Sequence, residues 1–115
     1  MKVSFEGIGE SVVTFYNSKI AAVGAGAPVK MSGNGEVSAC ADGNRFFGAA
    51  LACDADFAAV QTGGYAQLVY SGTAPAVGFA KLASNGEGGV KIAETGGEFL
   101  VVDVDTISKT IGFML

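Results

Sequence analysis

The sequence predicts an all-β fold: a small antiparallel β-barrel or rolled β-sandwich with an N-terminal arm. From residue 28 onward, short apolar or alternating runs recur about every 8 to 12 residues, a rhythm typical of sandwiches and barrels. Each run is bounded by Gly, Asn, Asp or Ser, which favour tight turns. With 115 residues, the chain is long enough for one domain with a single core.

The strands of the barrel domain, residues 28–115, are expected in these runs. They are predicted at residues 28–31, 37–40, 46–52, 58–62, 65–70, 77–83, 89–93, 98–105 and 110–115. Five segments between these strands contain residues that tolerate positive φ: 32–35, 42–44, 62–64, 84–86 and 95–97. Such turns predict antiparallel hairpins between most neighbouring strands. Helix is expected at most as a single turn around residues 54–59.

The core is predicted from apolar positions that alternate with small or polar ones, because alternate residues of a strand share a face. A register error of one residue would exchange the faces of a strand. The predicted core residues are Val29, Met31, Val37, Phe47, Leu51, Val60, Leu68, Tyr70, Val77, Phe79, Leu82, Val90, Ile92, Leu100, Val102, Val104, Ile111 and Phe113.

Residues 1–27 form the predicted arm, in which glycine pairs at residues 7–9 and 24–26 flank one apolar strand at 12–16. We expect this strand to pair onto a sheet edge or to reach a neighbouring subunit or capsid surface, because backbone hydrogen bonds supply affinity without charged side chains. The alternative is that it completes its own barrel as an ordinary first strand. The interface candidates are Val12, Val13, Phe15 and Tyr16.

Composition limits the partners of the chain. Only 16% of the residues are charged and 50% are hydrophobic, against about 25% charged in ordinary domains, so we expect a partner to cover part of the surface. The net charge of −4 and the scattered basic residues argue against nucleic acid, which is bound through clustered Lys and Arg. No leader-like segment or membrane-length apolar run occurs, so we expect a cytoplasmic product with no membrane partner.

Candidate catalytic and metal-binding groups are few, since the chain has no His, the commonest general base. Asp103 and Asp105 share one strand face and could form the carboxylate dyad of a hydrolase. The preferred interpretation is that they are the solvent-exposed residues of a half-buried strand. Asp54 and Asp56 resemble part of a calcium loop without its remaining ligands, which favours a solvated loop. We therefore expect no catalytic residue, no metal site and no cofactor.

Cys40 and Cys53 are the only cysteines, and their alanine-rich surroundings predict two free, buried or half-buried thiols. A zinc site would need further ligands beside the two cysteines, and the chain has no His to supply them. Gly33-Asn34-Gly35 lacks the third glycine of a nucleotide-binding loop and precedes a strand, so it is expected to form a turn.

Several segments resemble a known family: residues 72–82, 88–91, 98–105 and 110–115. Their order over residues 28–115 is similar to that of small β-barrel proteins encoded beside the major capsid protein of tailed phages and prophages, the capsid decoration or cement proteins. The resemblance implies a non-enzymatic virion structural protein, made in the bacterial cytoplasm, that binds the outside of an assembled capsid. Its implied partners are the major capsid protein and further copies of itself, with a trimer favoured.

An alternative function follows from the fold class alone. Small β-barrels can hold a ligand inside the barrel or at one mouth, so a small-ligand or glycan-binding module is also compatible with the sequence. A barrel interior filled with side chains would argue against a ligand held inside.

Overall fold

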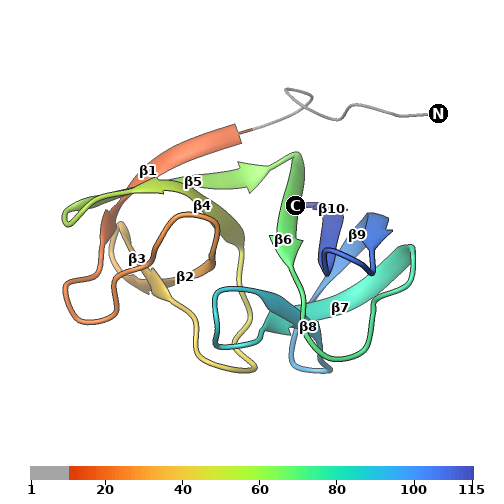
Figure 1. The fold of residues 1–115 in the computed structure, drawn as a ribbon. Helices are drawn as coiled ribbons and strands as arrows, with labels where there is room; N and C mark the ends of the chain where they lie inside the picture. Colours follow the sequence, from red (N-terminus) through yellow and green to blue (C-terminus); the bar gives the residue numbers. More distant parts are fainter. Residues whose placement is uncertain (1–10) are drawn as a thin grey trace.

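The computed structural model describes residues 11–115, and their regular structure is entirely β (Figure 1). It confirms the predicted all-β class and each predicted strand to within a few residues. The strands are β1 (Ser11–Asn17), β2 (Pro28–Gly33), β3 (Glu36–Ala39), β4 (Gly48–Cys53), β5 (Phe57–Gly63), β6 (Tyr65–Val69), β7 (Gly78–Ser84), β8 (Val90–Ile92), β9 (Gly97–Asp105) and β10 (Thr110–Met114). No helical turn forms at residues 54–59, where β5 begins instead.

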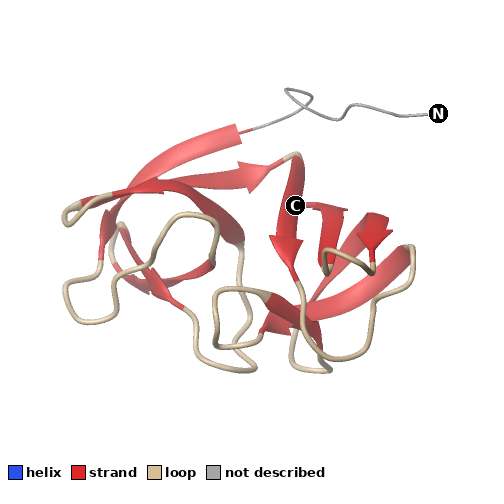
Figure 2. Ribbon diagram, in the orientation of Figure 1, coloured by secondary structure: helices blue, strands red, loops and turns tan. Residues whose placement is uncertain are grey.

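The chain folds into two five-stranded units, one after the other. The first half forms a closed barrel with the order β1-β3-β2-β4-β5, and the second half forms a sheet with the order β6-β10-β9-β7-β8. All strand pairs are antiparallel except β1 with β3. Figure 2 shows that loops and turns make all the connections between strands.

The predicted arm strand lies in the barrel of its own chain. β1 pairs antiparallel with β5 from Ser11–Gly63 to Tyr16–Phe57, and parallel with β3 only at Tyr16 and Asn17. This is the alternative arrangement, in which the arm strand completes its own barrel. Residues 1–10 of the predicted arm lie outside the described residues.

The second sheet curls until its edges meet at one point. Tyr70, just after β6, forms a parallel bridge with Val90 of β8. The Ser71 N–H donates to the Val90 carbonyl at 3.0 Å. One bridge thus joins the two edges of this sheet, whereas β1 and β5 of the first half pair from Ser11–Gly63 to Tyr16–Phe57.

Hairpins are fewer than predicted. Neighbouring strands pair in β2–β3, β4–β5, β7–β8 and β9–β10, whereas the turns at 42–44, 62–64 and 95–97 join strands that do not pair with each other. Glycine permits a sharp turn whether or not the next strand pairs with the preceding one, because it adopts positive φ as readily as negative φ. The turn at 42–44 instead contacts the second half, where the Gly43 N–H donates to the Ser84 carbonyl at 2.8 Å.

Each half has its own core. In the first barrel, small and medium side chains fill the interior: Val23, Val29, Val37, Ala50, Ala58 and Val60. In the second, larger side chains dominate: Phe46, Ala49, Ala66, Leu68, Tyr70, Leu82, Val90, Val101, Ile111 and Phe113. Phe46 and Ala49 belong to the first half of the sequence, so they tie the two halves together.

The predicted core was wrong at six positions, which are exposed: Met31, Leu51, Val77, Phe79, Ile92 and Leu100. Bulges explain two of them. Between β9 and β10, Gly112 pairs with Asp103 but Phe113 pairs with Val101, so the extra residue Val102 turns Val101 inward and Leu100 outward. A similar shift at Leu51 of β4 leaves that side chain exposed.

Phe79 was misplaced for a simpler reason. It lies three residues before Leu82 on β7, and an odd separation puts two side chains on opposite faces of a strand. Leu82 is fully buried, whereas Phe79 is 74% exposed.

The two halves meet at Gly64, the single residue between β5 and β6. The buried Gln61 side chain spans this junction, because its Nε2 donates to the Gly63 carbonyl at 3.0 Å and to the Tyr65 carbonyl at 2.6 Å. The Leu115 N–H donates to the Gly64 carbonyl at 2.9 Å. Side-chain and backbone hydrogen bonds therefore fix how one unit follows the other.

Candidate protein-binding surface

Of the two carboxylates considered for catalysis, Asp105 serves the β9–β10 turn. Asp105 Oδ1 accepts the N–H groups of Ile107 at 2.9 Å and Ser108 at 3.1 Å. These bonds, that of Ser108 first, lower the pKa of Asp105 below its usual range. Asp103 and Asp105 are both exposed on the outer face of β9, and the bonds of Asp105 are those of a turn residue.

In the second Asp-x-Asp pair, Asp54 plays the same part just before β5. Asp54 Oδ1 accepts the N–H groups of Phe57 at 2.7 Å and Asp56 at 2.8 Å, and these bonds lower the pKa of Asp54. Asp56 forms an ion pair with Lys19. Within residues 11–115, no group of three or more His, Cys, Asp or Glu side chains could hold a metal ion.

Both cysteines are free and half-buried, as predicted. Burial raises the pKa of the Cys40 thiol, partly opposed by Lys30, and burial together with the Asp54 charge raises the pKa of Cys53. Since the thiolate is the nucleophilic form, both environments disfavour reactivity.

Three of the four interface candidates are exposed and one points inward. Val12, Val13 and Tyr16 have exposed fractions of 49%, 44% and 61%. Phe15 is half-buried against the barrel core, where its ring meets that of Phe47 edge to face at 5.8 Å. Alternation along β1 explains the difference between Phe15 and Tyr16.

Tyr16 has a partner that the sequence did not indicate. It lies directly across the strand pair from Phe57, and the two rings stack with centroids 5.6 Å apart. Phe57 is 48% exposed. We call Val12, Tyr16 and Phe57 the barrel patch. The 41-residue separation hid the Tyr16–Phe57 pair, because only the β1–β5 register brings them together.

Hollows on the outer surface flank the barrel patch. One, of about 390 Å³, is lined by Tyr16, Asn17, Lys19, Glu36, Asp56 and Phe57. Another, of about 380 Å³, is lined by Thr14, Phe15, Tyr16, Gly35 and Phe57. The Lys19–Asp56 ion pair lies at the rim, and Lys19 Nζ also donates to the Ala55 carbonyl at 2.8 Å. An aromatic centre with a polar rim is the usual anatomy of a protein interface.

The patch adjoins a strand edge that is paired on one side only. β3 pairs with β1 at residues 16 and 17, so residues 11–15 have no strand partner on that side among the described residues. These residues are Ser, Val, Val, Thr and Phe, without the Lys or Pro that commonly protects an edge. The edge and the barrel patch together could accept an extended segment of another protein.

Residues 11–115 include no helix that is long and apolar enough to cross a membrane. No protein-family model matches the sequence, and no curated protein matches it.

Proposed function

We propose that this chain is a non-enzymatic virion structural protein that binds the outside of an assembled phage capsid. The observation that carries the proposal is the uncharged, half-paired edge of β1 beside the exposed Tyr16–Phe57 stack. The resemblance to capsid decoration proteins names the partner, the major capsid protein. Further copies of the chain belong to the same proposal, with a trimer favoured at the symmetry positions of the capsid.

The chemistry of this surface suits protein binding. Strand addition at an open edge draws affinity from backbone hydrogen bonds and needs few charges, which fits a chain with 16% charged residues. Tyrosine is enriched among residues that dominate binding energy, especially where it is surrounded by groups that exclude water. Tyr16 lines both hollows beside the patch, where groups of a partner could surround it.

Co-sedimentation with capsids of the phage that encodes the chain tests the proposal. We expect the full chain to pellet with capsids saturably. We expect Tyr16→Ala to weaken binding about tenfold or more, as for a central interface aromatic, and Val12→Lys to weaken it by placing a charge at the edge.

Ile107→Ala is the matched control, because Ile107 is equally apolar, 94% exposed and distant in the β9–β10 turn. Circular dichroism melting curves check that each variant folds. A wild-type chain that ignores capsids, or a Tyr16→Ala variant that binds as the control does, contradicts the proposal.

A glycan-binding module is the second candidate, and one observation favours it. The exposed Tyr16–Phe57 stack lies beside the polar groups of Lys19, Asp56 and Glu36, a set that could contact a sugar ring and its hydroxyls. A ligand held inside is not favoured, since side chains fill both interiors. The chain has no Trp, so tyrosine fluorescence titrated with neutral oligosaccharides tests this directly. A flat titration, or one unchanged by Tyr16→Ala, rejects it.

A further inference from the structure

A second apolar surface lies on the outer face of the other sheet. Strand register places four side chains in one row across four strands: Phe79 of β7 opposite Leu100 of β9, Leu100 opposite Met114 of β10, and Met114 opposite Tyr65 of β6. Directly opposite residues project from the same face. We call these four residues the sheet row.

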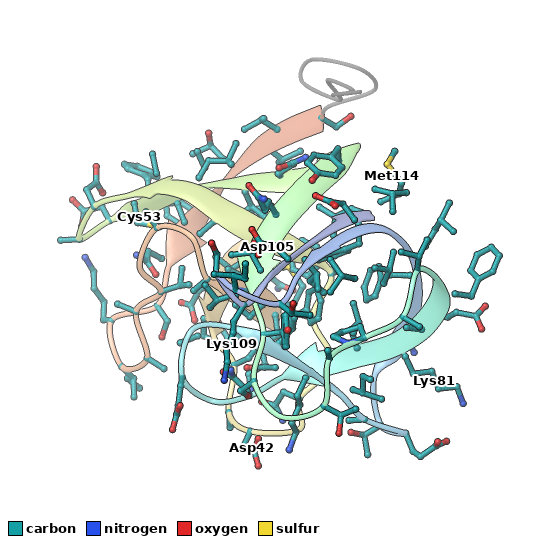
Figure 3. The ribbon with its side chains drawn as sticks, turned by 45° about the vertical axis from the view of Figure 1, so that its right-hand side comes forward. Asp42, Cys53, Lys81, Asp105, Lys109 and Met114 are labelled. Carbon is teal, nitrogen blue, oxygen red and sulfur yellow. The ribbon has the colours of Figure 1, made fainter. Side chains whose placement is uncertain are left out.

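The sheet row is open to solvent at one end. Phe79 is 74% exposed and Leu100 37%, while Met114 and Tyr65 are half-buried. Figure 3 shows Met114 and Lys81 projecting outward on the side of the molecule formed by this sheet. Tyr65 packs over Gly112, where any larger residue would collide with its ring. Single exposed apolar residues are ordinary, whereas four neighbouring apolar side chains on one face offer a surface that a partner can cover.

The sheet row is separate from the barrel patch, because it lies on the other five-stranded unit. The proposed capsid contact through β1 therefore leaves it unused. A partner for this row must match both its apolar centre and the charges beside it.

Two of those charges form a self-complementary pair, and Asp103 of β9 is a third charge on the same face. Lys81 and Glu98 lie directly opposite each other, two residues from Phe79 and Leu100 respectively, on the same outer face. In a two-fold contact, residue i of one copy meets residue j of the other and the reverse. A second copy can thus place its Glu98 beside Lys81 and its Lys81 beside Glu98. The present partner of Lys81, Glu94 at 3.6 Å, is 95% exposed and is easily exchanged.

We propose that the outer face of the second sheet is a two-fold contact for a second copy of this chain, with the two sheet rows packed against each other. Strand spacing of about 4.8 Å and a rise of about 3.3 Å per residue give the row and its neighbours an area of roughly 300 Å² per copy. Stable interfaces bury about 800 Å² per partner. The contact is therefore weak in free solution and strengthens where copies are held close together.

Sedimentation velocity of the full chain, from roughly 10 μM to 1 mM, tests the contact. These concentrations cover the range expected for a weak interface. We expect the mean mass to rise with concentration toward that of a dimer. Phe79→Ser should shift the association at least about tenfold toward monomer, because Phe79 supplies the most exposed apolar area of the row. Ile107→Ser is the matched control and should associate as the wild type does.

Charge reversal tests the two-fold geometry itself. K81E and E98K should each associate less than the wild type, because each creates like charges across the axis. Mixing the two single variants should restore association, since each then faces the opposite sign in its partner. Restoration cannot come from pairing within one chain, because no single chain carries both changes.

Three results would overturn the inference: a wild-type mass that stays monomeric to 1 mM, association that survives Phe79→Ser, or a mixture of K81E and E98K that associates no better than either alone. Thermal melting curves confirm that the variants are folded. The assay uses only the purified chain, so its outcome is independent of whether the chain binds capsids.

Discussion

In the first half of the chain, β1 pairs with β5 along almost its whole length and closes five strands into a barrel. In the second half, the corresponding edges meet only at the Tyr70–Val90 bridge. The sheet with fewer closing hydrogen bonds has the larger core side chains. Valine and alanine fill the closed barrel, whereas three phenylalanine rings, Phe46, Phe99 and Phe113, pack together with centroids 5.0 to 6.1 Å apart in the second unit.

We infer from this difference that the two sheets of the chain are stabilised by different means. Small side chains bury little area each, so we infer that the first barrel depends on close backbone approach and on the long β1–β5 ladder. Aromatic side chains bury much larger areas and gain from ring contacts, so the second sheet tolerates an almost open seam. Four changes test this contrast, from the loss of a buried aromatic ring, with the largest expected effect, to the loss of turn carboxylates, with the smallest.

Phe113→Ala should be the most damaging. The ring is fully buried and contacts both Phe46 and Phe99, so its loss should lower the free energy of unfolding by about 3 to 5 kcal/mol. Urea denaturation measures the change. Phe15→Ala is the matched variant in the first barrel, where the half-buried ring should cost less. Equal losses at the two sites would mean that the barrel relies on its aromatic residues as much as the second sheet does.

Gly48→Ala should destabilise the first barrel by disturbing the close approach of two backbones. A Cβ at Gly48 would collide with the Gln61 carbonyl oxygen and come within 2.9 Å of Val60 Cγ1, which forces the β4–β5 pair apart. We expect a loss of about 1 to 3 kcal/mol in urea denaturation. Gly24→Ala is the control, because nothing lies within 4 Å of its Cβ position. A neutral Gly48→Ala would show that the barrel does not need this close approach.

Gln61→Leu tests the junction between the two halves. It keeps the side-chain volume but removes the donors to the Gly63 and Tyr65 carbonyls, which should cost about 1 to 2 kcal/mol. Gln67→Leu, on the exposed outer face of β6, is the control. Denaturation followed by tyrosine fluorescence and by circular dichroism shows whether the halves still unfold together. Unchanged stability would mean that the junction is held by the backbone alone.

Asp54→Asn and Asp105→Asn should have the smallest effects, one in each half. Turn N–H groups lower both folded-state pKa values from the ordinary value of 3.8. The stability that each carboxylate contributes is therefore present above that value and lost as the pH falls through the lower folded pKa. Melting temperatures between roughly pH 2 and pH 6 should vary less steeply in each variant. Thr106→Ala, which keeps the carboxylate of Asp105, is the control. If the melting temperatures of the aspartate variants depend on pH as steeply as that of the control, the prediction is wrong.

The strands were predictable because their signals are local. Turn residues such as those at 32–35 and 84–86 bound short alternating runs, and every predicted strand is present. Which strands pair was not predictable, since a glycine turn at 62–64 passes the chain to a second sheet as readily as it closes a hairpin. The predicted faces were wrong at Leu51 and Leu100, because a single extra residue in each strand reverses the alternation.

The candidate surface was predictable in part. The apolar run at 12–16 indicated Val12 and Tyr16, but Phe57 could join them only through the β1–β5 register. The sheet row was missed because Phe79 and Leu100 were assigned to the core. An odd spacing from Leu82 was the available signal for Phe79, whereas nothing local marks the bulge that turns Leu100 outward.

The position of β10 between β6 and β9 sets the order of events during synthesis. All strands of the first barrel lie within residues 11–63, so they are all synthesised before any strand of the second sheet. β6 then lacks its neighbour β10, which is translated about 45 residues later, and at about 5 to 20 residues per second the delay is roughly 2 to 9 seconds. Through that interval Leu68 lacks the Ile111 and Phe113 side chains that complete its core. The nascent chain is therefore most vulnerable to aggregation in its second half, until β10 inserts between strands made before it.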